Sequence, residues 1–255
     1  MEKENKSSGL IKTGAETFGA AIGGAIGLLG GPLGAIGGSV AGVLISKGLS
    51  EFADKYLSKK EQARAGAAAG LTILGVQEKI DSGLTLRQDG FFDFDEINRS
   101  KAEELFEGIL LKCKNEFEEK KIKYISNIYK NVAFDNSINP DNANQILNSV
   151  QQFSYRQLTI LSLVGQNGNN IFSLRLSDYR DDYETVSVEL EFLLQDFIEL
   201  NRQGLITRSD NTSMLDTSDV IPGIMKLTLI GQDYFQLLNL DTMPEIEFSY
   251  LDSLK

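Results

Sequence analysis

Apolar side chains recur every three or four residues along most of residues 49–164, which is the spacing of amphipathic helices. Three of these runs begin with a serine that has a glutamate or glutamine three residues later, at Ser58, Ser100 and Ser154. Such pairs form capping boxes, in which each side chain bonds the backbone amide of the other residue. The pattern predicts helices over residues 49–57, 58–81, 100–134, 139–153 and 154–164, with a possible kink in the charged run 118–121.

The pattern changes after residue 164. Short apolar runs at residues 171–176, 205–207 and 224–227 are separated by polar segments and predict short strands. Helical spacing returns over residues 185–202 and 228–240. Residues 154–255 are therefore expected to form a mixed α+β module, whereas everything before them is expected to be helical.

The longest uncharged segment runs from Thr17 to Ser46, and ten of its thirty residues are glycine. Thr13 and Glu16 match a capping box, so we expect a helix to begin near Gly14 and continue into this segment. A glycine at every fourth position leaves a groove along one helix face, into which a second helix packs closely. A shorter uncharged run, residues 65–76, repeats the spacing. The predicted zipper and oligomer contacts are Gly19, Gly23, Gly27 and Gly31 in one register, Gly30, Gly34, Gly38 and Gly42 in a second, and Gly66 with Gly70.

Three other structures are alternatives for the same segment. A flexible linker would carry more polar residues, and a phosphate-binding loop would need Lys and Ser or Thr where Val43 and Leu44 stand. A buried helical hairpin fits better, because Gly30, Gly31 and Pro32 favour a turn with the proline opening a second helix. A continuous helix of this length would measure about 45 Å, more than a bilayer core requires. The sequence is compatible with either a single membrane span or a helical hairpin for residues 17–46.

The charge is unevenly distributed along the chain. The net charge of −11 divides into −2 for residues 1–152 and −9 for residues 153–255. The acidic half would repel a free phosphate backbone. The single cysteine, Cys113, is typical of a reducing cytosol, and the mixed charges of residues 1–6 argue against a secretory signal. Lys and Arg are denser just after the uncharged segment than before it, so the positive-inside rule places the bulk of the protein in the cytoplasm.

The side chains needed for most catalytic sites are missing. The sequence contains no histidine, which removes His-based triads and zinc sites. Cys113 falls on the apolar stripe of a predicted helix, where a packed thiol is expected rather than a nucleophile. Two carboxylate clusters could touch a cation, but neither has a phosphate-binding Gly/Lys element beside it. These clusters are Asp93, Asp95 and Glu96, and Asp178, Asp181, Asp182 and Glu184. We therefore expect no catalytic site, no cofactor and no metal.

The order of elements in residues 154–240 is similar to the winged-helix domain of many bacterial regulators. The matching signals are residues 201–206, which end a helix and begin a strand, and residues 227–231, with the pattern L-T-x-x-G opening the last helix. The helix at residues 185–202 carries four acids, Glu189, Glu191, Asp196 and Glu199, and Glu184 directly precedes it, against the single Arg202. A helix that reads DNA normally presents basic and short polar side chains. The module is therefore expected to bind protein rather than duplex DNA.

Taken together, the glycine repeats, the helical middle and the acidic end resemble small membrane effectors of bacterial anti-phage systems, with the Hailong membrane effector family as the nearest suggestion. That resemblance implies a tetrameric, channel-like protein kept inactive by single-stranded DNA oligomers that a partner nucleotidyltransferase makes. Such a ligand would need a basic pocket. The basic residues that are densest in the sequence, and that we expect to form this pocket, are Lys112, Lys114, Lys120, Lys121 and Lys123, with Lys130 nearby.

The expected fold is mainly α, with glycine-zipper helices in residues 1–83, a central helical bundle in residues 84–153 and a winged-helix-like α+β module in residues 154–255. The expected function is a toxic, pore-forming, homo-oligomeric effector of the bacterial inner membrane, with its C-terminal domains in the cytoplasm and a possible cytosolic form before activation. The alternative is a soluble helical adaptor or regulator, in which residues 14–76 form a buried hairpin and the acidic module binds a protein.

Overall fold

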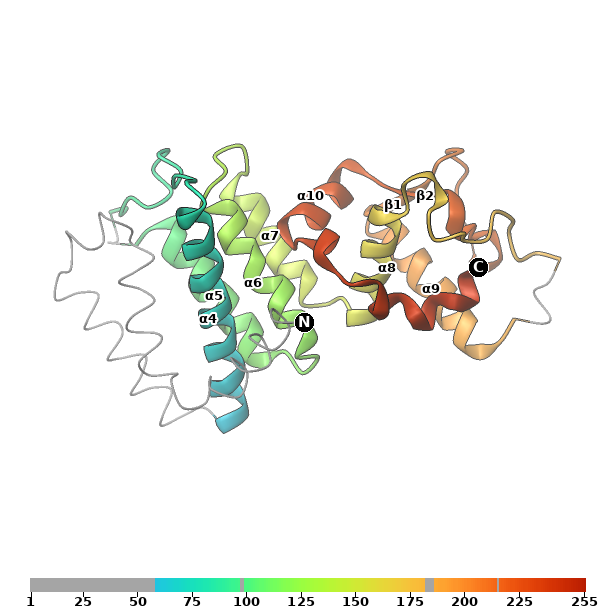
Figure 1. Cartoon of the computed structure of the whole chain (residues 1–255), viewed down its shortest axis with the longest axis horizontal. Coiled ribbons are helices and arrows are strands. Elements are labelled where there is room, and N and C mark those ends of the chain that lie inside the picture. The colour runs from blue at the N-terminus through green and yellow to red at the C-terminus, as the bar shows by residue number, and fades with distance from the viewer. Residues whose placement is uncertain (1–57, 97–98, 182–185, 215) are drawn as a thin grey trace. The chain divides into compact units, whose positions relative to one another are not determined.

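The protein is mainly α-helical (Figure 1). The computed structural model describes residues 58–96, 99–181, 186–214 and 216–255, and this part contains seven α-helices and one two-stranded sheet. The predicted helices of residues 14–57, with all but two of the predicted zipper glycines, lie outside the described residues. The chain divides between Gln152 and Phe153 into two compact units, called unit 1 and unit 2 below.

Unit 1 is a bundle of four described helices: α4 (Lys59–Asp81), α5 (Lys101–Asn115), α6 (Lys120–Val132) and α7 (Pro140–Val150). The capping boxes predicted at Ser58 and Ser100 are confirmed, and Asn139 caps α7 ahead of Pro140. The predicted helix over residues 100–134 is broken at the charged run, and α5 and α6 fold back on each other there. Residue 83, where a domain boundary was expected, lies between α4 and α5 of this one unit.

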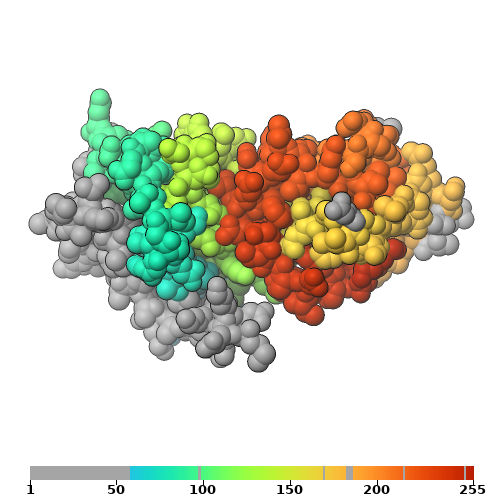
Figure 2. Space-filling view, turned by 45° about the horizontal axis from the view of Figure 1, so that its top comes forward, coloured from blue at the N-terminus to red at the C-terminus, as the bar shows by residue number. Residues whose placement is uncertain are grey.

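The central helix of unit 1 is α6. Its consecutive residues from Tyr124 to Tyr129 are all buried, because α4, α5 and α7 pack around it. Small residues of α4 let that helix approach closely: Ala65, Ala68 and Ala69 are fully buried, and Thr72 donates a hydrogen bond to the Ser126 carbonyl at 3.5 Å. Other α4 side chains, such as Leu74, lie on the surface, and part of α4 faces the viewer in Figure 2 in cyan.

The segment between α4 and α5 is fastened by Arg87. Its backbone amide donates to the Ala133 carbonyl at 3.0 Å, and its guanidinium donates to the carbonyls of Val132 at 3.1 Å and Ile138 at 3.0 Å. The Phe91 ring lies beneath the guanidinium and is buried. Phe94, three residues further along the same loop, is 62% exposed.

Unit 2 contains α8 (Tyr155–Gln166), α9 (Val188–Arg202), β1 (Ile206–Arg208), β2 (Met225–Leu227) and α10 (Leu229–Leu237). α8 is its central helix and packs against α9, α10 and β2. The strands are antiparallel, and Thr207 pairs with Lys226. Short 3-10 helices complete the unit at Gly168–Asn170, Thr217–Asp219, Pro222–Ile224, Leu240–Thr242 and Glu245–Leu254.

The strand predicted at residues 171–176 is absent. The Asn170 side chain accepts the Leu174 amide at 2.9 Å, and the Arg175 amide donates to the Leu254 carbonyl at 2.8 Å. The Arg175 carbonyl accepts the Gly223 amide at 2.8 Å. Because these backbone groups bond to a side chain and to two separate segments, no ladder forms here.

The turn from α9 into β1 and the start of α10 meet at Thr228. Its hydroxyl accepts the Gly231 amide at 3.0 Å, as a helix N-cap does, and donates to the Gly204 carbonyl at 2.5 Å. Gly204 has a φ of +71°, a conformation that glycine adopts without strain. Gly231 lies against the Leu205 carbonyl, where a Cβ would clash. The glycines and the threonine singled out in the sequence thus join these three elements.

Candidate functional site

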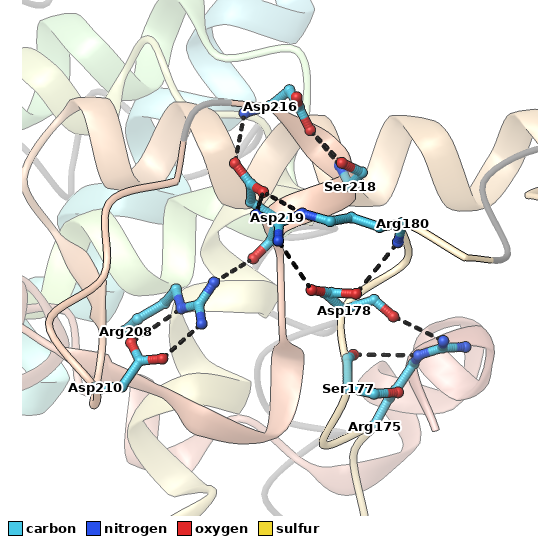
Figure 3. A network of polar contacts seen from close by, with 9 residues as sticks. All are labelled: Arg175, Ser177, Asp178, Arg180, Arg208, Asp210, Asp216, Ser218 and Asp219. Atoms are coloured by element: carbon cyan, nitrogen blue, oxygen red, sulfur yellow. Dashed lines mark hydrogen bonds and ion pairs between the residues drawn. The ribbon is translucent and has the colours of Figure 1, made fainter.

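Unit 2 contains a network of arginines and aspartates (Figure 3). The Asp219 carboxylate accepts hydrogen bonds from the Arg180 guanidinium, and the Asp219 backbone carbonyl accepts one from Arg208 at 2.9 Å. Arg208 also forms a two-pronged ion pair with Asp210, at 3.1 and 2.6 Å. The network joins three segments: residues 175–180, the end of β1, and the 3-10 helix at Thr217–Asp219.

The charges of this network are mutually satisfied. Arg208 holds the pKa of Asp210 down at about 2, and Asp219 raises the pKa of Arg180 above its usual value. Both shifts move the pKa values further from neutral pH, so neither Asp210 nor Arg180 is suited to exchange protons at neutral pH. The arrangement therefore fastens the segment between β1 and β2 rather than presenting an acid or a base.

Beside the network, Tyr179 is buried beneath the Arg175 guanidinium, which lies 4.3 Å from the ring centroid. Arg175 donates to the carbonyls of Ser177 at 3.2 Å and Asp178 at 2.7 Å. Within the described part of the chain, the Tyr179 hydroxyl is the one buried side-chain polar atom without a hydrogen-bond partner. Burial raises the pKa of this phenol, so it stays protonated at neutral pH.

The described members of the predicted carboxylate clusters lie on loops. Asp95 accepts the Arg99 amide at 3.0 Å, and Asp93 donates its own amide to the Gly90 carbonyl at 3.1 Å. Asp178 accepts the Arg180 amide at 3.3 Å, whereas Asp182 and Glu184 lie outside the described residues. No three acidic or cysteine side chains of the described ranges converge as metal ligands would.

Cys113 lies on the inward side of α5 and is fully buried. Burial raises the pKa of its thiol, and the nearby Glu116 carboxylate raises it further. The thiolate is the nucleophilic form of cysteine. The Cys113 thiol is therefore protonated and shielded at neutral pH.

The structure separates the predicted basic patch into different environments. Lys120 and Lys123 are exposed, and Lys112 and Lys114 are half-buried. Lys121 is buried instead, and its ammonium contacts Glu116 at 2.6 Å and donates to the Gln151 carbonyl at 3.2 Å. Lys121 therefore adds no charge to an exposed ligand surface. This ion pair could not be predicted from the sequence, because a lysine next to three other charged residues usually lies in solvent.

Of the predicted zipper glycines, Gly66 and Gly70 belong to the described part. Gly66 is buried and Gly70 is half-buried, both in the uncharged run of α4. At about 100° per residue, both lie well over 90° around the helix from Thr72, which contacts α6. The two glycines thus lie on a different side of α4 from its contact with α6.

The outer side of α9 carries two exposed apolar residues one turn apart, Val188 and Phe192. The Arg156 guanidinium lies 5.9 Å from the Phe192 ring and is bound by Asp196. Glu189 is exposed between the apolar pair. This mixture of apolar and acidic side chains is more typical of a protein-binding face than of a DNA-reading one.

None of the helices in residues 58–96, 99–181, 186–214 and 216–255 is both long and apolar enough to cross a bilayer. Comparisons of the chain with protein families, with curated proteins and with solved structures found no match.

Proposed function

We propose that this protein is an oligomeric, membrane-disrupting effector of the bacterial inner membrane, of the kind that anti-phage systems keep inactive until infection. The observation that carries the proposal is the thirty-residue uncharged segment with a glycine at every fourth position in two registers. One copy is weakly hydrophobic because a third of the segment is glycine. Several copies with interlocked glycine faces would bury their backbones against one another and line a pore.

The arrangement of α4 supports this assembly. One side of the helix is occupied by α6, through Thr72 and through Gly75, where an added Cβ would meet the Lys130 side chain. Gly66 and Gly70 face another direction in the same uncharged run. A glycine-rich helix of the same chain or of a second copy would pack closely along them.

Units 1 and 2 would form the cytoplasmic body that sets the oligomer and senses the trigger. The order α8, α9, β1, loop, β2 and α10 supports a winged-helix-like form for unit 2. The proposed partners are further copies of the chain in a tetramer, the inner membrane, and a nucleotidyltransferase or its oligonucleotide product. Duplex DNA is not among them, because α9 is acidic.

Fractionation and toxicity of full-length variants test the proposal. Replacing Gly23, Gly27, Gly34 and Gly38 with leucine makes the segment more apolar but fills the groove. We expect membrane association to persist and growth arrest to be lost. The matched control places four leucines at Ala20, Ala21, Ala25 and Ala41, which leaves both glycine registers intact and should preserve toxicity. Unchanged toxicity of the glycine variant would remove the zipper from the mechanism.

The α9 surface favours the second candidate, a soluble adaptor that binds a protein through Val188 and Phe192. In that case residues 14–76 would form a core within one monomer. The two candidates give opposite results in the same fractionation. Recovery of all the wild-type protein as a soluble monomer would refute the membrane effector, and α9 variants that lose a bound protein would then identify the adaptor.

A further inference from the structure

One end of unit 1 gathers basic residues that are far apart in the sequence. This basic end consists of residues 58–64, where α4 begins, and residues 112–123, which end α5 and begin α6. Arg64 and Glu119 join the two segments through an ion pair of 3.1 Å. Glu61 caps α4 by accepting the Ser58 amide at 2.7 Å. Its pKa is lowered first by hydrogen bonds with Ser58 and then by the charges of Lys114 and Arg64.

The basic end is positive although the whole protein is negative. Its two segments hold eight basic and four acidic residues, an excess of four in a chain whose net charge is −11. One of these acids, Glu116, is buried against Lys121, so the pair cancels internally. Lys59, Lys60, Lys120 and Lys123 are all exposed. The surface is therefore complementary to a layer of negative charge.

An exposed aromatic residue lies in the same place. Phe117 is in the turn between α5 and α6, and its surface is 79% exposed, although phenylalanine is usually buried. Leu111, on α5, is also exposed. Aromatic and aliphatic side chains among lysines are typical of surfaces that lie at the boundary between lipid headgroups and acyl chains.

The chain also enters the described structure at this end. Ser58, the cap of α4, is twelve residues beyond Ser46, the last residue of the uncharged segment. Twelve residues span at most roughly 40 Å when fully extended. If the uncharged segment enters a bilayer, the start of α4 is held within that distance of the membrane surface, whereas the opposite end of α4 is a further 23 residues along the helix.

We propose that the basic end lies against the phosphate headgroups of an anionic bilayer, with Phe117 inserted at the interface and Lys59, Lys60, Lys120 and Lys123 contacting the lipid phosphates. This orientation rests on the proposed membrane function and adds the lipid class to it. A single-stranded oligonucleotide carries the same phosphate groups. Its binding, however, would not explain why the uncharged segment joins unit 1 at the basic end, whereas a bilayer that holds the segment would.

Vesicle binding by the full-length protein tests the orientation. Sedimentation would compare vesicles of phosphatidylcholine alone with vesicles that also contain phosphatidylglycerol. A lysine near an anionic surface strengthens binding about five-fold. The double variant Lys120→Gln/Lys123→Gln should therefore bind the anionic vesicles about 25-fold more weakly, and Phe117→Ser about ten-fold more weakly. Added salt should reduce the lysine effect.

Two controls lie on other parts of unit 1. Lys101 is an exposed lysine at the opposite end of α5, and Phe94 is an exposed phenylalanine in the loop before α5. Lys101→Gln and Phe94→Ser should leave vesicle binding unchanged. Each variant is first checked for folding through Cys113, which is buried and must stay unreactive toward a thiol reagent.

The outcomes separate this inference from the proposed function. Equal wild-type binding to both vesicle types, or equal losses in the test and control variants, would overturn the orientation and leave the membrane function standing. The orientation would also be overturned if the Lys120→Gln/Lys123→Gln variant lost binding to a labelled single-stranded oligonucleotide but bound vesicles as the wild type does. The lysines would then be assigned to an oligonucleotide site. Failure of the wild-type chain to bind either vesicle would refute the membrane function itself.

Discussion

The buried ion pair between Glu116 and Lys121 provides the sharpest test of how unit 1 is built. Each side chain is 2% exposed, and the charged atoms are 2.6 Å apart. The Glu116 carboxylate also accepts the Glu118 amide at 3.0 Å, and Lys121 donates to the Gln151 carbonyl near the end of α7. The pair therefore closes the turn between α5 and α6 and connects it to the last helix of the unit.

Lys121→Met keeps much of the packed aliphatic stem but removes the ammonium. The Glu116 carboxylate then remains buried without its charge partner, which typically costs about 3–5 kcal/mol. With a typical urea slope of about 2 kcal/mol/M, the unfolding midpoint of unit 1 should fall by about 1.5–2.5 M. Adding Glu116→Gln removes the unpaired charge, and the double variant should recover at least half of the loss.

Cys113 makes it possible to follow unit 1 alone. It is the single cysteine of the chain and is fully buried in α5, so pulses of a thiol reagent at increasing urea report the opening of this unit. Arg99→Met serves as the control, because Arg99 and Glu107 form an exposed pair in the same unit. Such pairs contribute about 0–1 kcal/mol. If Lys121→Met shifts the midpoint no more than Arg99→Met, the pair does not hold the unit together.

Two further predictions concern unit 2. Gly231→Ala should destabilise unit 2 by about 1–3 kcal/mol in calorimetry, because the added methyl meets the Leu205 backbone. The control Gly168→Ala, which has open space around it, should melt like the wild type. Arg208 depresses the pKa of Asp210 to about 2 from an ordinary value of 3.8, so the stabilisation is complete above about pH 4 and is lost as the pH falls toward 2. Asp210→Asn should reduce the change in unfolding midpoint between those pH values, and an unchanged pH profile would show that the ion pair does not contribute to stability.

Several features of the fold could be predicted because their causes are local. The helix starts at Ser58, Ser100 and Ser154 depend on hydrogen bonds between residues three apart, all of which are present in the sequence itself. The break between α5 and α6 falls at a run of charged residues. The β1 and β2 strands also lie within a residue or two of their predicted positions, because each follows a glycine or a 3-10 turn.

The candidate surfaces were less predictable because they depend on distant partners. Lys121 and Lys120 are neighbours in the sequence, yet Lys121 is buried against Glu116 and Gln151 whereas Lys120 is exposed. Phe91 and Phe94 read alike in the sequence, but only Phe91 lies beneath Arg87, a contact that depends on how the loop meets α6.

By itself, the sequence determined the helical content, the helix caps, the uncharged glycine repeat and the uneven charge, because each depends on residue type and short-range spacing. Tertiary structure alone decided that the start of α4 meets the turn between α5 and α6, since Arg64 and Glu119 are 55 residues apart. It also decided which lysines and phenylalanines of unit 1 face solvent. Burial is a property of packed helices rather than of any one of them, and for that reason the basic end becomes visible only when the helices are assembled.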